Sequence, residues 1–157
     1  MLYIEAPKNK STDKLKLFLA GSITDAPDWQ KEVVERLEAF DIAVLNPRRK
    51  NFPMEDPDAA REQITWEHDS LKDADMISFW FAKESLAPIT LYELGAWTKT
   101  GKPIVIGVDP KYRRKQDVEI QTSLERPEIP ICYSLDDLVE NIRAMILRVV
   151  LSKKGAL

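Results

Sequence analysis

Short apolar segments alternate along the chain with segments in which apolar residues recur at helical spacing. Strands buried on both faces are predicted where nearly every position is apolar, over residues 15–21, 41–47, 75–82, 102–109 and 129–134. Helices are predicted over residues 28–40, 58–74, 88–101 and 135–150. The polar segment 112–128 is predicted to be a loop with at most one helical turn.

Strands that alternate with helices and are apolar on both faces are typical of a parallel sheet covered by helices on each side. We therefore predict a single-domain α/β fold, flavodoxin-like or Rossmann-like, with a five-stranded parallel sheet. Residues 1–14 are expected to form a polar N-terminal tail, and residues 15–157 the domain. A chain of 157 residues is long enough to form one domain with its own core.

In such sheets the ligand site lies beyond the carboxyl ends of the strands. The segments that follow the first four strands are GSITD, NPRRKNF, AKESLAPITLYE and DPKYRRKQD. We expect them to converge on one crevice.

Two glutamates occupy positions where the helical pattern predicts apolar residues. Glu93 shares a stripe with Ile89, Ala96 and Trp97. A carboxylate on an apolar helix face is unfavourable unless it is paired, hydrogen-bonded or kept there for chemistry.

Glu67 repeats this pattern on the preceding helix, where it shares a stripe with Ala60, Ile64 and Leu71. Two inward carboxylates near one cleft suggest a nucleophile and a binding or acid–base partner, as in glycoside chemistry. The alternative is structural, because arginines are available as ion-pair partners: Arg48, Arg49, Arg113 and Arg114.

Composition narrows the possible partners. A net charge of −3 argues against a nucleic-acid polymer as partner and leaves small nucleosides open. The single cysteine excludes an internal disulfide and favours a reducing, cytoplasmic location. The N-terminus lacks the apolar run of a signal peptide, and no segment has the length of a membrane span. One histidine and one cysteine leave little for a metal site, and we expect no cofactor.

The motifs LFLAGSI, WEHDSLKDADMISFWF and PITLYELGAW, in this order and spacing, resemble the nucleoside 2-deoxyribosyltransferase superfamily, from about residue 17 to residue 121. The resemblance implies that Glu93, in ELG, is the nucleophile that forms a covalent glycosyl ester. It implies that Glu67 holds or polarises the sugar, at a position where family members usually carry aspartate. It also implies that neighbouring subunits complete each other's sites, so we expect a homo-oligomer.

The chain departs from the family pattern at two positions. Phe18 replaces a tyrosine, and Ala87 replaces the aspartate with which many transferases protonate the base. Asp117 is our candidate for that missing acid, because it lies near an asparagine that transferases contribute to a neighbouring site.

Other candidate substrate-binding residues come from the matched motifs and from the third strand. We expect Phe18, Gly21, Ser22, Asn46, Arg48 and Ala87 to lie at the substrate. Phe81 is predicted either to stack on a base or to pack in the core. In the related monophosphate hydrolases of this superfamily, Gly/Arg-rich residues follow GSI and serine stands at the Ala87 position. The resemblance therefore favours a free 2′-deoxynucleoside for this chain, which has neither, while Arg48 and Arg49 leave a 5′-monophosphate possible.

Three activities therefore remain open. The first is transfer of 2-deoxyribose between free bases, and the second is hydrolysis of a deoxynucleoside or deoxynucleotide. The third is nucleotide binding without turnover, which the changes at Phe18 and Ala87 would favour.

Overall fold

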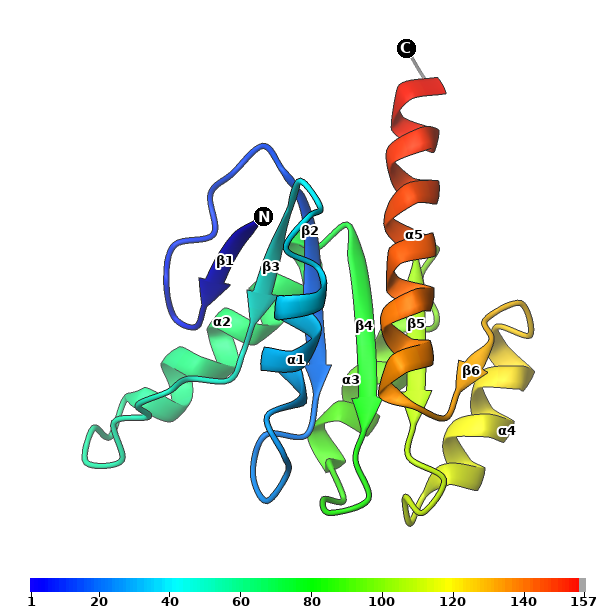
Figure 1. Ribbon diagram of the computed structural model, residues 1–157. Helices are drawn as coiled ribbons and strands as arrows, with labels where there is room; N and C mark the ends of the chain where they lie inside the picture. The colour runs from blue at the N-terminus through cyan, green and yellow to red at the C-terminus, as the bar shows by residue number, and fades with distance from the viewer. Residues whose placement is uncertain (156–157) are drawn as a thin grey trace.

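A six-stranded parallel sheet forms the centre of the molecule (Figure 1). The structure is a computed structural model, and it describes residues 1–155. The strands are β1 (Leu2–Glu5), β2 (Leu15–Gly21), β3 (Ile42–Asn46), β4 (Met76–Phe81), β5 (Ile104–Val108) and β6 (Ile131–Cys132). The helices are α1 (Trp29–Arg36), α2 (Ala59–Asp73), α3 (Pro88–Trp97), α4 (Lys115–Glu125) and α5 (Leu135–Gly155).

The α/β class and the flavodoxin-like order are confirmed. The strand order is β1-β3-β2-β4-β5-β6, in which the five predicted strands follow the order second, first, third, fourth, fifth. The count of five was one short, because β1 adds an edge strand that pairs in parallel with β3. This strand lies inside the expected polar tail. It is four residues long and buries only Ile4 fully, so its hydrophobic signal is weak.

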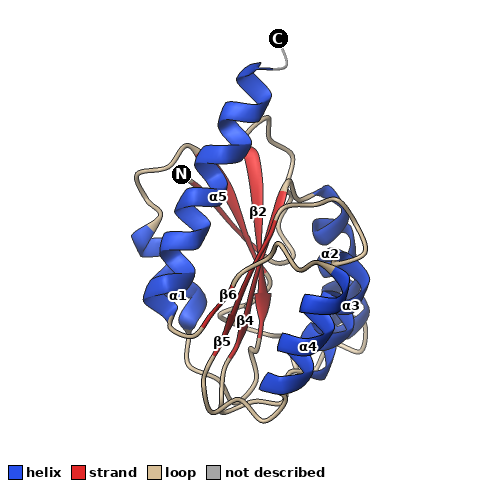
Figure 2. Ribbon diagram, turned by 90° about the vertical axis from the view of Figure 1, so that its right-hand side faces the viewer, coloured by secondary structure: helices blue, strands red, loops and turns tan. Residues whose placement is uncertain are grey.

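Helices cover both faces of the sheet, with α1 and α5 on one side and α2, α3 and α4 on the other (Figure 2). Asp28 caps α1, its carboxylate accepting a 3.1 Å hydrogen bond from the Lys31 N–H. The α1/α5 side is filled by Trp29, Val33, Leu138 and Ile142 among others, and the opposite side by residues that include Phe18, Phe79, Phe81 and Leu94.

The segment predicted as a loop contains a full helix, α4. Only Val118 and Thr122 are buried along its 11 residues. Two buried positions, one of them polar, give a helical periodicity too weak to recognise in the sequence.

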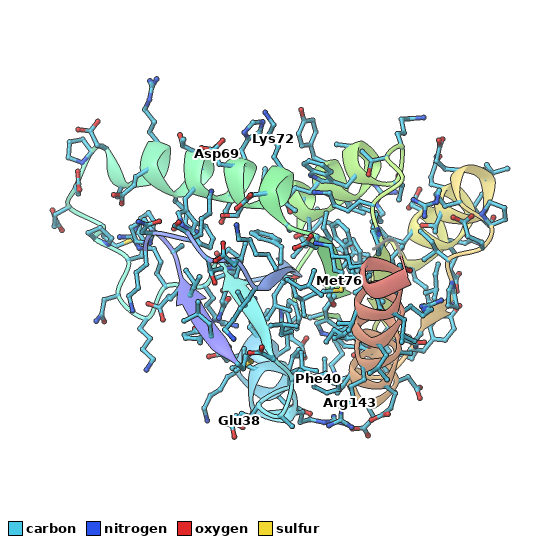
Figure 3. The ribbon with its side chains drawn as sticks, turned by 90° about the horizontal axis from the view of Figure 1, so that it is seen from above. Glu38, Phe40, Asp69, Lys72, Met76 and Arg143 are labelled. Carbon is cyan, nitrogen blue, oxygen red and sulfur yellow. The ribbon has the colours of Figure 1, made fainter. Side chains whose placement is uncertain are left out.

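The predicted apolar stripes of α2 and α3 were misplaced. On α2 the buried residues include Trp66, Ser70 and Leu71, while Ile64 is 66% exposed and Ala60 is also exposed. Figure 3, viewed from above, shows Asp69 and Lys72 on the outer side of α2, away from the sheet.

On α3 the buried residues are Thr90 and Leu94, whereas Ile89 is 64% exposed and Ala96 is exposed. Both glutamates nevertheless face inward, because each lies at the edge of its buried face and points toward a cavity between the helices.

Candidate active site

A cavity of about 330 Å³ lies at the carboxyl ends of β2, β3 and β4, between α2 and α3. Three of the four segments expected to converge do line it, and the segment 109–117 does not. Two acids, four hydroxyl-bearing residues and small or apolar residues form its wall: Phe18, Ala20, Gly21, Ser22, Ile23, Thr24, Pro47, Glu67, Ser85, Ala87, Pro88, Ile89, Thr90 and Glu93.

Glu93 projects into this cavity from the second turn of α3. Within residues 1–155 no hydrogen bond reaches its carboxylate. Burial, with a smaller contribution from the neighbouring charge of Glu67, raises the pKa of Glu93 from 4.5 to about 8. Glu93 is therefore mostly protonated at neutral pH in the free protein and must lose that proton before it can act as a nucleophile.

Glu67 reaches the same cavity from α2. Its Oε1 accepts a 2.7 Å hydrogen bond from Gln63 Nε2, one helical turn earlier. Burial raises the pKa of Glu67, and the Gln63 hydrogen bond opposes that shift. The two carboxylates thus share one cavity but differ in their hydrogen bonding.

Arg48 supports the cavity wall without lining the cavity. Its Nη1 donates to the Pro27 carbonyl (2.8 Å) and to Gln30 Oε1 (3.0 Å). Its Nη2 donates to the carbonyls of Ile23 (3.0 Å) and Ala26 (2.8 Å). The guanidinium therefore holds the β2–α1 loop in place, and the expectation that it contacts substrate is not supported by its position.

Asn46 also has a structural role in place of the expected substrate contact. Its amide nitrogen donates to the Tyr3 hydroxyl (3.0 Å), and its amide oxygen accepts from the Arg48 backbone N–H (2.9 Å). These bonds connect the edge strand β1 to the turn after β3, and Asn46 does not line the cavity.

Two further candidates lie elsewhere. Phe81 is fully buried in the core, with its ring centroid 5.2 Å from that of Tyr112. Of the two predicted roles, this position fits packing in the core and not stacking on a base. Asp117 is exposed on α4, 3.5 Å from the Arg114 guanidinium, and lines a separate cavity between α3 and α4. Asp117 therefore cannot serve the Glu93 cavity of its own chain from this position.

The remaining candidates do line the cavity. Phe18 forms an apolar part of its wall, and Gly21 packs so tightly that a Cβ there would lie 2.6 Å from the Trp80 carbonyl oxygen. The Ser22 hydroxyl is buried and has no hydrogen-bond partner among the described residues. Ala87 adopts the left-handed conformation (φ 46°), a strained geometry for a residue with a side chain, immediately before α3.

Several lining residues were not predicted. Thr90 precedes Glu93 by three residues on α3, so helical spacing could have revealed that both face the same side. Gln63 does not line the cavity, but its position four residues before Glu67 could likewise have indicated that it contacts that carboxylate. Ile23, Thr24, Pro47 and Ser85 lie in segments that were expected to converge on the crevice, but no sequence signal distinguished these residues from their neighbours.

Comparison with known families identifies the lineage of this site. The family model described as "Nucleoside 2-deoxyribosyltransferase like" matches residues 14–112, which is more than half of the chain. The chain belongs to this nucleoside 2-deoxyribosyltransferase-like family. The match contains every residue that lines the cavity, including both glutamates. No curated protein matches the chain.

Membership of the deoxyribosyltransferase-like family associates the cavity with glycosyl transfer of nucleosides. Across the described residues, no three His, Cys, Asp or Glu side chains are grouped so as to hold a metal ion. In the same part of the chain, no helix combines the length and apolar character that crossing a membrane requires.

Glu93→Gln is expected to stabilise this deoxyribosyltransferase-like protein above neutral pH. The pKa of Glu93 is higher in the folded protein than its usual 4.5. The contribution of protonated Glu93 to the free energy of unfolding is therefore complete below pH 4.5 and is lost as the pH rises through about 8. The free energy of unfolding should therefore fall with pH in the wild type and fall less in the variant. At pH 8.5 we expect a difference of about 2–4 kcal/mol by urea titration.

The matched control is Glu84→Gln, which alters an exposed glutamate in the β4–α3 loop. Its pH dependence should follow the wild type. Equal slopes for Glu93→Gln and the wild type would mean that Glu93 does not carry a raised pKa.

Proposed function

We propose that this protein transfers 2-deoxyribose from one nucleobase to another through a covalent ester on Glu93. The observation that carries the proposal is the presence of two carboxylates, Glu93 and Glu67, in one partly enclosed cavity of a deoxyribosyltransferase-like chain. A cationic, oxocarbenium-like sugar is stabilised by anionic groups in such a site.

The chemistry consists of two displacements at one carbon. An oxygen of ionised Glu93 attacks C1′ from the face opposite the base, and the C1′–N bond breaks with its electron pair passing to the base nitrogen. That nitrogen takes a proton from a general acid, for which Asp117 of a neighbouring subunit is the candidate, and the second base later returns a proton to that acid. A nitrogen of a second base next attacks C1′, loses its proton and releases Glu93 as a carboxylate. Two inversions retain the configuration at C1′.

Charge favours a free nucleoside over its 5′-monophosphate. The titratable side chains that line the cavity are both acids, and a phosphate would meet repulsion there. The nearby arginines are engaged, Arg48 with loop carbonyls and Arg49 with Glu62 at 3.1 Å. We expect 2′-deoxyinosine to be used well and its 5′-monophosphate poorly.

Incubation with 2′-deoxyinosine and free adenine tests the proposal directly. A transferase yields 2′-deoxyadenosine and hypoxanthine, which chromatography separates. Free 2-deoxyribose formed equally with and without adenine would identify a hydrolase instead. Absence of any cleavage, with binding of the nucleoside retained, would identify a binding module.

Ribonucleosides are expected to be poor substrates. Glu93 must approach C1′ from the face on which a ribose 2′-hydroxyl projects, so that hydroxyl and the attacking carboxylate compete for the same space. We expect kcat/KM for inosine to be lower than for 2′-deoxyinosine by about 100-fold or more. Equal values for the two nucleosides would contradict the steric argument.

We also propose that the active protein is a homo-oligomer. The cavity contains no acid besides Glu67 and Glu93 that could protonate a leaving base, so a residue from another subunit, with Asp117 as the candidate, would complete it. Large apolar side chains are exposed on α3 and α4, near the cavity rim and beside Asp117, and are suited to an interface: Ile89, Tyr92, Ile120 and Leu124.

Sedimentation should find a dimer or a larger assembly. Tyr92→Glu should dissociate the assembly and lower activity. Because residue 92 does not line the cavity, the loss of activity would follow from dissociation and not from a lost substrate contact. A wild-type monomer with full activity would overturn this proposal.

A further inference from the structure

Gln63 lies behind the cavity and connects two parts of its wall. Its Nε2 donates one hydrogen bond to Glu67 Oε1 (2.7 Å) and another to the carbonyl of Pro47 (2.7 Å). Pro47 itself lines the cavity after β3, whereas Gln63 does not. One amide nitrogen thus connects α2 to the β3–α2 loop and to the Glu67 carboxylate.

The Pro47 carbonyl determines which end of the amide meets Glu67. A carbonyl oxygen can only accept hydrogen bonds, so the NH₂ group of Gln63 must face it. The reversed amide would set its oxygen against two acceptors. The observed orientation leaves Gln63 Oε1 buried without a hydrogen-bond partner among the described residues. Such an atom is unfavourable, which indicates that the two donated bonds are the stronger requirement.

No basic group lines the cavity to neutralise either carboxylate. The lining residues come from β2 and the loop after it, from Pro47, from α2, from the β4–α3 loop and from α3. The titratable side chains among them are Glu67 and Glu93 alone. Two neighbouring carboxylates in one cavity resist simultaneous ionisation, so the pair holds a proton. An N–H donated to only one of them makes the pair unequal, because such a bond favours the ionised form of its acceptor.

We propose that Gln63 is a positioning residue that keeps the negative charge of the pair on Glu67 and leaves the proton on Glu93 in the resting protein. Gln63 acts through Glu67 and does not touch the substrate. The proposal deepens the proposed function, on which its catalytic meaning rests. Under this proposal, Glu67 is already ionised before the reaction begins and supplies the negative charge that faces the developing sugar cation.

The directions of the two pKa shifts agree with this arrangement. The Gln63 hydrogen bond lowers the pKa of Glu67 against the effect of burial, whereas no hydrogen bond lowers that of Glu93. Removal of the amide should raise the pKa of Glu67. It should also lower the pKa of Glu93, because a protonated Glu67 no longer repels its charge.

The test is a carboxyl titration by ¹³C NMR of the complete chain labelled at the glutamate δ carbon. The Glu67→Gln and Glu93→Gln variants assign the two resonances. In the wild type we expect the Glu67 resonance to titrate first and the Glu93 resonance near pH 8. In Gln63→Met we expect the Glu67 midpoint to rise and the Glu93 midpoint to fall, each by about one pH unit.

Two further variants make this result decisive. Gln63→Asn keeps an amide but is one methylene shorter and cannot bridge both acceptors, so it should reproduce the shifts even if Gln63→Met fails to fold. Gln116→Met changes an exposed glutamine on α4 and should leave both midpoints unchanged. Unchanged midpoints in both Gln63 variants, or a wild-type Glu93 that titrates before Glu67, would overturn the proposal.

This titration needs no substrate, so its outcome is independent of whether the protein transfers deoxyribose. If turnover is observed, the pH profile of kcat/KM gives a second reading. Its acid limb should move to higher pH in Gln63→Met, because the active form has both carboxylates ionised and loses the hydrogen bond that favours ionised Glu67. A purely structural role for Gln63 would lower the rate equally at all pH values.

Discussion

Glu93→Ala is expected to abolish deoxyribosyl transfer while leaving the fold intact. The variant removes the group on which we propose that the covalent ester forms, so the loss in turnover should be on the order of 10⁴-fold or more. The fold should survive because Glu93 makes no hydrogen bond within the described residues and burial disfavours its ionised form. Initial rates with 2′-deoxyinosine and adenine, together with a thermal unfolding curve, provide the measurement.

Glu84→Ala is the matched control for this prediction. Glu84 is exposed in the β4–α3 loop, nine residues before Glu93, and does not line the cavity. It should retain wild-type rates. Substantial turnover by Glu93→Ala would show that another residue, or water, attacks C1′.

Glu67→Gln is expected to reduce turnover by roughly 30- to 1000-fold, with a smaller effect on substrate binding. The substitution keeps the shape of the side chain and removes its charge, so it chiefly affects the cationic transition state. Preorganised electrostatic groups of this kind contribute about 2–4 kcal/mol. Single-turnover rates and substrate dissociation constants separate the two effects.

Glu67→Ala extends this test, because it also removes the hydrogen-bond acceptors that we propose face the sugar, and it should weaken binding as well. Glu62→Gln is the control. Glu62 lies on the same helix as Glu67 but is exposed, pairs with Arg49 at 3.1 Å and does not line the cavity. An unchanged rate in Glu67→Gln would return Glu67 to a structural role.

The sheet and the inward glutamates were predictable because their signals are local. Buried strands such as β4 are apolar at nearly every position, with Ser78 the polar exception in β4, and the alternation with helices determines the parallel order. Glu67 and Glu93 were recognised as unusual because each interrupts an apolar pattern. The exact stripes were wrong, since residues such as Ile64 and Ile89 are exposed on the outer faces of their helices.

The candidate residues that lie outside the cavity could not be placed from the sequence for a different reason, which is that their contacts join distant segments. Arg48 looked available for a ligand, yet its guanidinium is occupied by carbonyls of the β2–α1 loop some 20 residues earlier. The Asn46 amide donates a hydrogen bond to Tyr3, which lies on a strand that was not predicted. Such pairings follow from strand order and loop packing, which no short motif encodes.

The central claim is that a sugar becomes bonded to Glu93, and trapping that bond tests it most directly. A 2-fluoro-arabinosyl nucleoside should form the ester but break it slowly, because fluorine destabilises the cationic transition state of both steps. Peptide mass spectrometry of the trapped protein should find the added fluorosugar on Glu93. The same sugar on a different residue, or turnover of this substrate with no protein-bound sugar at any time, would contradict the account.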